Sequence, residues 1–304
     1  MKLVKLKPVV KSYIWGGTYF QKFGKGAGFP LVSELWELSL RDGNSSIIDS
    51  GPDKGKNLNE VITDKDIGDV VKTFKYFPLL IKLIDAEDAT SVQVHPNDEY
   101  AMKHENSFGK SEMWHVISAD KGSGVYVGFK KDYSKEEIER HLKDGTILDL
   151  LNFFEAKPGD TFVINPGIIH AVSKGVRFIE IQQNSDITYR LFDYNRVDMN
   201  GNGRPLHIEK ALENIDCHKY TSYSHGQKVL ADNKFFTVEA IDVDGELVID
   251  ANGDSFKSFT SIEGDGTADN IPFKQFDTFF LPHHQKCVVK GKCKLIISSV
   301  KNKK

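Results

Sequence analysis

Short runs of β-branched and aromatic residues, separated by Gly, Pro, Asn and Asp, make up most of this chain. Runs of this length and composition are typical of strands with turns between them. Before residue 216, the expected strands are residues 3–8, 35–40, 79–85, 91–95, 112–117, 124–127, 161–164, 176–182 and 191–194. The pattern therefore predicts an all-β fold, either a barrel or a sandwich.

Helical signals are fewer and interrupt the β pattern. Residues 57–73 are weakly periodic, and residues 134–151 open with a capping-box sequence, Ser-Lys-Glu-Glu, ahead of spaced apolar residues. Residues 97–103 can start another helix, with Asn97 as its cap and acidic residues in its first turn. We expect the first two segments to be helical insertions in a β scaffold.

A polar, turn-rich stretch at residues 216–227 divides the chain. Beyond it, residues 235–243, 247–250, 255–263, 277–280, 286–289 and 293–298 again have the composition of strands. We expect one domain over residues 1–222 and a smaller β domain over residues 223–304. His283 and His284 fall in the second part without a carboxylate at a useful spacing, so we interpret them as loop surface.

Composition limits the class of protein and its partners. The 304 residues carry a net charge of −3, with 39% hydrophobic and 27% charged residues. These values suit a soluble globular protein and give no electrostatic case for binding nucleic acid or a membrane. The N-terminus lacks the apolar core of a signal peptide, and no later run is long enough to span a bilayer. Three cysteines are too few for a disulfide framework, so we expect a cytoplasmic location.

Two histidines, a glutamate and a glutamine form a candidate metal-binding set. Gln93 and His95 are two residues apart in an alternating stretch, so both side chains project from the same face of the expected strand. Glu112 begins another strand, and His170 follows a Pro-Gly turn that would aim it inward. Two imidazoles, a carboxylate and an amide oxygen could fill most of the coordination sphere of a Zn²⁺-like ion. If they converge, the site faces the inside of the barrel.

Each of these residues also has an ordinary interpretation. A histidine in a strand is usually exposed or hydrogen-bonded, but His95 precedes a proline at the end of its strand, and Gln93 would be unusual in a core unless its amide were bound. His115 competes with Glu112 in the same segment, but the alternation of a strand turns it to the opposite face. The remaining histidines of the first part lie in polar stretches and are interpreted as surface: His104, His141, His207, His218 and His225.

Several segments together resemble the class I mannose-6-phosphate isomerase family, and the short bacterial form most closely. They are residues 91–98 (SVQVHPND), 109–114 (GKSEMW), 165–171 (NPGIIHA), 182–190 (QQNSDITYR), 13–17 (YIWGG) and 34–37 (ELWE). The resemblance extends from about residue 5 to residue 205. It implies a double-stranded β-helix, or jelly roll, of the cupin superfamily, followed by a second, smaller cupin-like β domain.

The resemblance also implies an activity and a set of site residues. Members of the family are zinc-dependent aldose–ketose isomerases that interconvert mannose 6-phosphate and fructose 6-phosphate through a cis-enediol. The implied ligands of the single zinc ion are Gln93, His95, Glu112 and His170, of which the glutamine is the least firm. Arg190 matches a catalytic arginine, and Asp186 matches an aspartate that lines the site.

The chemistry explains these residue types. Moving a carbonyl between two carbons transfers no electron out of the sugar, so a redox-inert Lewis acid is sufficient. Arg190 is always charged and can hold an oxyanion or phosphate through two parallel bonds. For the phosphate, the candidate cations are Lys110 and Arg196, with Ser91 as a neutral donor.

The group that transfers the proton stays open at this point. The candidates are a zinc-bound water, Asp186, Lys110, and His170 if its bond to the metal is labile. A histidine bound to a metal cannot easily act as a base, because the nitrogen that would accept the proton is occupied.

Two rival functions remain. An iron dioxygenase also uses two histidines and a carboxylate, but Gln93 replaces the first histidine of the common cupin pair, and the candidate phosphate-binding cations would have no role. A non-catalytic sugar-binding protein would be marked by loss of a ligand or of Arg190, and neither is lost. We therefore expect an enzyme whose partner is a small sugar phosphate, as a monomer or weak homodimer.

Overall fold

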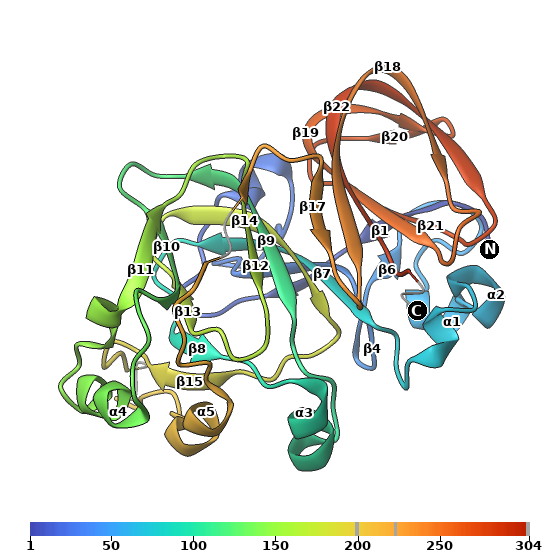
Figure 1. Cartoon of the computed structure of the whole chain (residues 1–304). Helices are drawn as coiled ribbons and strands as arrows, with labels where there is room; N and C mark the ends of the chain where they lie inside the picture. The colour runs from blue at the N-terminus through green and yellow to red at the C-terminus, as the bar shows by residue number, and fades with distance from the viewer. Residues whose placement is uncertain (198–200, 222–223, 302–304) are drawn as a thin grey trace.

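A computed structural model describes residues 1–197, 201–221 and 224–301 of the chain. Its strands lie mainly in three antiparallel sheets (Figure 1). The five-stranded sheet runs β11 (Leu151–Glu155), β10 (Gly124–Phe129), β13 (His170–Val172), β8 (Val92–Val94) and β15 (Tyr189–Phe192). The seven-stranded sheet runs β16 (Ser224–His225), β12 (Asp160–Ile164), β9 (Glu112–Ala119), β14 (Val176–Gln183), β7 (Leu79–Ala86), β3 (Glu34–Leu38) and β2 (Val9–Lys11).

The third sheet has eight strands and lies beside the other two (Figure 1). Its order is β17 (Val229–Asp232), β18 (Thr237–Asp250), β22 (Lys286–Ser299), β19 (Lys257–Ala268), β21 (Thr278–Leu281), β1 (Val4–Lys7) and β6 (Ile47–Ile48), with β20 (Ile271–Phe273) paired to β19. A separate two-stranded ribbon is formed by β4 (Leu40–Arg41) and β5 (Asn44–Ser45).

The five-stranded and seven-stranded sheets pack face to face. Trp114 and Phe178 of the seven-stranded sheet share one apolar cluster with Val125, Val127 and Val172 of the five-stranded sheet. The prediction of an all-β fold is confirmed, and the two facing antiparallel sheets have the layout of the expected jelly roll. Between the described residues the two sheets are not joined edge to edge by hydrogen bonds, so the expected barrel is an open sandwich.

The two outer faces of this sandwich are also covered. Val92 and Val94 of β8 pack outward against Ile138 of α4 (Lys135–Lys143) and Ala211 of α5 (Ile208–Asn214). On the other side, residues of β7 and β14 join an apolar cluster with the eight-stranded sheet, with Ile81, Ile179, Phe280 and Ile296 among its members. The sequence-distant C-terminal strands therefore cover a hydrophobic face of the seven-stranded sheet.

Helices form in each of the three predicted segments, but one of the segments is divided into short pieces. Asn97 caps α3 (Asp98–Glu105) by accepting from the backbone N–H of Tyr100 at 2.9 Å, and Ser134 opens α4 with a complete capping box. Residues 57–73 form short pieces: α1 (Leu58–Val61), α2 (Asp64–Ile67) and the 3₁₀ turn η2 (Val71–Thr73). Two further 3₁₀ turns are η1 (Phe20–Phe23) and η3 (Ile147–Leu150). In the described residues no helix is long and apolar enough to cross a membrane.

The C-terminal strands are longer than the sequence indicates. Gly245 lies within β18 directly opposite Gly291 of β22, where the sequence pattern predicts breaks between separate strands. A Cβ atom at Gly291 would lie 2.4 Å from the carbonyl oxygen of Asp265 on the next strand. These glycines allow long strands to pass close to one another; they do not end them.

The eight-stranded sheet combines both ends of the chain. Val4 of β1 pairs with Phe280 of β21, and Leu6 of β1 pairs with Ile48 of β6. Two strands that precede the expected boundary at residue 222 thus complete the sheet of the C-terminal part. The boundary itself stays a prediction.

Candidate active site

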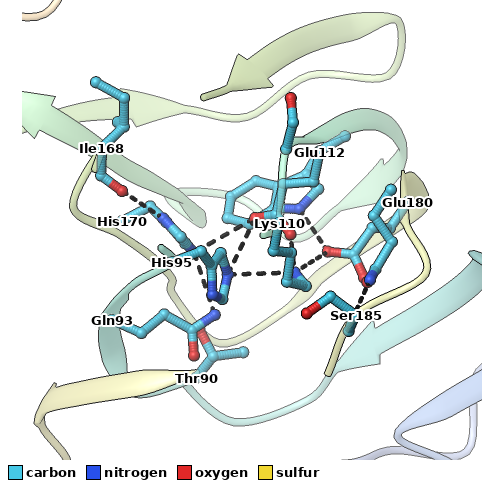
Figure 2. Close-up of polar contacts among 12 residues, drawn as sticks. Thr90, Gln93, His95, Lys110, Glu112, Ile168, His170, Glu180 and Ser185 are labelled. Carbon is cyan, nitrogen blue, oxygen red and sulfur yellow. Dashed lines mark hydrogen bonds and ion pairs between the residues drawn. The ribbon is translucent and has the colours of Figure 1, made fainter. Parts of the chain in front are cut away.

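His95, Glu112 and His170 converge between the two facing sheets (Figure 2). His95 directly follows β8 and His170 begins β13, in the five-stranded sheet, whereas Glu112 begins β9 in the seven-stranded sheet. One ligand atom from each lies within 4.8 Å of the others, and all three side chains are buried. The alternation of the strands produces this convergence, because Val92 and Val94 turn outward to the helices while Gln93 turns inward.

Both imidazole rings are oriented by the backbone. Nδ1 of His95 lies 2.8 Å from the carbonyl oxygen of Ile187, and Nδ1 of His170 lies 2.8 Å from that of Ile168. A carbonyl oxygen can only accept a hydrogen bond, so each Nδ1 carries the hydrogen and donates it, and each Nε2 keeps its lone pair. Burial lowers the pKa of His170 to about 3 and that of His95 well below its usual range, so both rings are neutral near pH 7.

The donor atoms of this cluster fit a metal ion. Oε1 of Glu112 lies 3.6 Å from Nε2 of His95 and 3.4 Å from Nε2 of His170. This oxygen is buried and receives no hydrogen bond from the described residues. Two neutral nitrogens with lone pairs and an unpartnered carboxylate oxygen, all facing one another, form a set that a cation would stabilise.

Gln93 lies against this cluster with its amide nitrogen inward. Its Nε2 is 3.2 Å from Nε2 of His170, and its Oε1 accepts from Oγ of Ser91 at 3.3 Å. In this orientation the amide donates to the ring and does not offer its oxygen to a metal. Exchanging the two amide atoms by rotation would reverse this, so the role of Gln93 as a ligand stays a prediction.

Lys110 lies beside the cluster (Figure 2) and also lines a neighbouring pocket. Its ammonium donates to Oε2 of Glu112, lies 3.2 Å from Nε2 of His95 and is 3.7 Å from Oε1 of Glu180. The side chain is buried, and burial lowers its pKa to about 8, although the Glu180 carboxylate offsets part of this effect. A lysine in this state can exchange a proton near neutral pH.

The pocket has a volume of about 360 Å³ and is lined by both aromatic and polar side chains. Aromatic side chains form one part of its lining: Tyr13, Trp15, Trp36, Trp114 and Phe178. The polar part comprises Glu34, Lys82, Thr90, Ser91, Gln93, Lys110, Glu180, Asp186, Thr188, Arg190 and Arg204. Apolar planes combined with many hydrogen-bonding groups suit a polar molecule such as a sugar.

Sequence reasoning missed a buried charge network in the floor of this pocket. Nζ of Lys82 lies 3.1 Å from Oε2 of Glu180 and 3.4 Å from Oε2 of Glu34. Burial by itself would lower the pKa of Lys82, but these carboxylates raise it above its usual range, while Lys110 and Lys82 hold the pKa of Glu180 well below its own. The available signal was a Lys or Glu flanked by apolar residues within an expected strand, as with Lys82 in LLIKLIDA at residues 79–86.

The remaining predicted residues occupy different places. Arg190 lines the pocket, with Nε 3.2 Å from Oγ of Ser91. Asp186 also lines it but is exposed and pairs with Nη2 of Arg41 at 2.9 Å. Arg196 does not line the pocket, since its guanidinium is turned to Asp88 and Asp193, and its role in phosphate binding stays a prediction.

His115 faces away from the cluster, as its position relative to Glu112 predicts. Its Nδ1 lies 2.9 Å from Oγ1 of Thr161 on the neighbouring strand β12. The ring is buried on the opposite face of the seven-stranded sheet from the pocket.

Comparison with known proteins identifies the family. The protein-family model for the catalytic domain of type I phosphomannose isomerase matches residues 3–116 of this chain. Mannose-6-phosphate isomerase ManA of Bacillus subtilis is 35% identical over 298 residues, which cover 91% of this chain and 92% of that protein. Mannose-6-phosphate isomerase of Streptococcus mutans is 36% identical over 252 residues, covering 80% and 79%. The crystal structure of mannose 6-phosphate isomerase from Bacillus subtilis superposes with a TM-score of 0.87 at 33% identity, covering 99% of this chain and 100% of that one. The resemblance that the sequence motifs indicated is confirmed, and the chain belongs to the type I mannose-6-phosphate isomerase family.

Proposed function

We propose that this chain is a zinc-dependent isomerase that interconverts mannose 6-phosphate and fructose 6-phosphate. The observation that carries the proposal is the convergence of Nε2 of His95, Nε2 of His170 and the unpartnered Oε1 of Glu112 behind a sugar-sized pocket. Two neutral imidazoles and one carboxylate match the donor set of catalytic zinc sites. Membership of the family supports the same substrate pair.

His95, Glu112 and His170 would hold the metal, and Gln93 would add its amide oxygen after rotation. When bound, the ion supplies a Lewis acid that polarises the sugar oxygens at the reacting carbons. Backbone carbonyls already orient both rings for this task, so binding requires little reorganisation of the chain.

Lys110 is our choice among the candidate proton-transfer groups. It lines the pocket beside the cluster, whereas Asp186 is held at the exposed rim by Arg41. The neutral amine takes the proton from C2 of the aldose, the cis-enediol forms, and the ammonium returns the proton to C1. The hydroxyl proton on O2 moves to O1 in the same conversion, so no atom is gained or lost. Arg190 holds negative charge at the other end of the pocket.

We keep the two-domain division at residue 222 and a monomer or weak homodimer as proposals. An apolar cluster formed almost wholly by C-terminal residues, including Phe259, Phe279 and Leu295, supports a second domain with its own core. Size-exclusion chromatography with light scattering at several concentrations tests the oligomeric state.

The function is tested by turnover and by metal dependence. Purified protein is incubated with fructose 6-phosphate, and mannose 6-phosphate is measured before chelation, after chelation and after addition of Zn²⁺, Fe²⁺ or Mn²⁺. We expect turnover that chelation abolishes and Zn²⁺ restores. Absence of turnover with every metal would overturn the isomerase proposal. Undiminished turnover in protein shown by elemental analysis to be metal-free would overturn the metal requirement.

A further inference from the structure

Positive charge in the floor of the pocket is already compensated. The ammonium of Lys82 lies near the carboxylates of Glu34 and Glu180, and the ammonium of Lys110 lies near those of Glu180 and Glu112. Apart from Glu112, whose charge the proposed metal ion would offset, two buried cations thus face the buried carboxylate of Glu180 and the partly buried carboxylate of Glu34. A phosphate dianion placed here would meet these carboxylates at close range, which the low dielectric of the interior makes unfavourable.

The rim of the pocket has the opposite balance. Arg190 bonds neutral acceptors, since its Nε donates to Oγ of Ser91 at 3.2 Å and its Nη1 donates to the carbonyl oxygen of Pro205 at 2.8 Å. Within the described part of the chain, Arg190 makes no ion pair with a carboxylate. Its charge is therefore available to an anion that enters the pocket.

Arg204 supplies a second guanidinium beside it, which sequence reasoning did not single out. Nε and Nη2 of Arg204 donate to Oδ2 and Oδ1 of Asp193 at 2.7 and 2.5 Å. This arrangement clamps one edge of the guanidinium, and Nη1 makes no hydrogen bond to any described residue. The carboxylate of Asp193 is buried, so it holds Arg204, a residue of the pocket lining, in one orientation.

The backbone fixes the two arginines relative to each other. The N–H of His207 donates to the carbonyl oxygen of Arg190 at 2.8 Å, and the N–H of Arg190 lies 3.3 Å from Nδ1 of His207. Together with the bond from Arg190 to Pro205, these contacts tie the segment that carries Arg204 along β15.

Arg196 lies outside the pocket lining. Its Nη1 donates to the carbonyl oxygen of Ala89 at 2.5 Å and lies 3.3 Å from Asp88, while its Nη2 pairs with Asp193 at 2.5 Å. These contacts use both ends of the guanidinium and hold it outside the pocket lining. They connect the loop after β7 to the loop after β15.

We propose that Arg204, positioned by Asp193, binds the phosphate of the substrate together with Arg190 at the rim of the pocket. The proposal rests on the proposed function and gives the substrate a direction. The phosphate lies at the rim, and the reacting end of the sugar reaches the floor, where Lys110 and the His/Glu/His cluster lie. Asp193 acts through Arg204 and is a positioning residue.

The first experiment compares R204Q, R204K and R196Q with R140Q, a control in which an exposed arginine of α4 is changed. We expect R204Q to raise KM for mannose 6-phosphate about 10- to 100-fold, because one charge-assisted bond is lost, with kcat changed less than about threefold. R204K should give a smaller rise in KM, since an ammonium keeps the positive charge but cannot donate the two parallel hydrogen bonds of a guanidinium. A KM for R204Q equal to that of R140Q, or a larger rise for R196Q than for R204Q, would overturn the assignment.

Equilibrium binding separates this proposal from the isomerase proposal. Mannose 6-phosphate, mannose and inorganic phosphate are titrated calorimetrically into each variant, so that no turnover is needed. We expect R204Q to weaken the binding of mannose 6-phosphate and of inorganic phosphate, and to leave the affinity for mannose unchanged. Equal loss for mannose, or no loss for phosphate, contradicts the proposal even in a protein that proves to be an active isomerase.

The role of Asp193 is tested by D193N and by the double variant D193N/R204Q. If Asp193 acts through Arg204, D193N raises KM without lowering kcat comparably, and the double variant is no worse than R204Q alone. Thermal melting of each variant identifies general loss of folding. Additive effects on KM in variants with unchanged melting would show that Asp193 does not work by positioning Arg204.

Discussion

Oε1 of Glu112 lies 3.4 Å from Nε2 of His170, although the two residues belong to opposite sheets of the sandwich. Neither the sheet of Glu112 nor that of His170 contains the whole donor set. The site therefore exists only when the two sheets are packed together, so binding of a metal and packing of the sandwich stabilise each other.

Replacing Glu112 by Gln should remove the carboxylate from the cluster while preserving its shape. We expect metal affinity to fall at least about tenfold, because the only anionic donor of the cluster is lost. Elemental analysis after dialysis against a dilute chelator measures the metal content. E139Q, at an exposed glutamate of α4, serves as the control. Unchanged metal content in E112Q would show that the ion binds elsewhere.

Replacing Arg190 by Ala should reduce kcat/KM much more than metal content. The guanidinium lines the pocket and its Nε lies 3.2 Å from Oγ of Ser91, and no hydrogen bond or ion pair links it to His95, Glu112 or His170. Because the substitution removes a charge that holds the substrate, we expect kcat/KM to fall about 100- to 1,000-fold. Steady-state kinetics and elemental analysis are run on the same samples. Loss of metal in proportion to loss of activity would mean that Arg190 has a structural role.

Glu37 should make the protein less stable as the pH rises. Its side chain is fully buried in β3, and burial raises its pKa to about 7, although Lys25 and the Thr278 side chain offset part of this effect. A raised folded-state pKa contributes stability that is complete below the unfolded pKa near 4.5 and is lost as the pH rises through about 7.

The variant E37Q mimics the protonated carboxyl. We expect it to increase the free energy of unfolding by about 2–3 kcal/mol at pH 8 and to change it little at pH 4.5. Urea denaturation at both pH values measures the difference, with E155Q as an exposed control. An equal effect of E37Q at the two pH values would exclude titration of Glu37 as the cause.

His115 should have the opposite pH dependence. Burial lowers its pKa to about 4, and its Nδ1 bonds to Thr161. Because the unfolded state binds the proton more tightly, stability is lost as the pH falls from about 6.5 towards 4. Between pH 7 and pH 4, the free energy of unfolding of H115Q should therefore fall by about 3 kcal/mol less than that of the wild type. Thermal melting across that range is compared with H104Q at an exposed histidine, and parallel curves for wild type and H115Q would refute the prediction.

Local pattern was sufficient to place side chains on faces. Alternation at residues 92–95 predicts that Gln93 and His95 share a face, and alternation from Glu112 predicts that His115 lies opposite; the structure agrees with both. These predictions succeed because the period of a strand depends only on its own backbone.

Charged residues inside apolar strands could not be assigned in the same way. Lys82 and Glu180 are far apart in sequence and become neighbours because β7 and β14 pair, with Glu180 opposite Lys82 in the register. A lone Lys in an apolar strand indicates a buried charge, but its partner depends on which strand lies alongside. The same limit applies to Arg196 and Arg204, since either could reach an anion from its position in the chain.

The sequence by itself determined the all-β class, the helix caps and the residue types of the metal cluster, because strand alternation, capping and ligand chemistry are local properties. The tertiary structure decided which of these residues meet. It paired β1 with β21, brought Glu112 across to His95 and His170, and placed Arg204 instead of Arg196 on the pocket lining. These outcomes depend on contacts between distant segments, which burial of apolar faces and long-range strand pairing select.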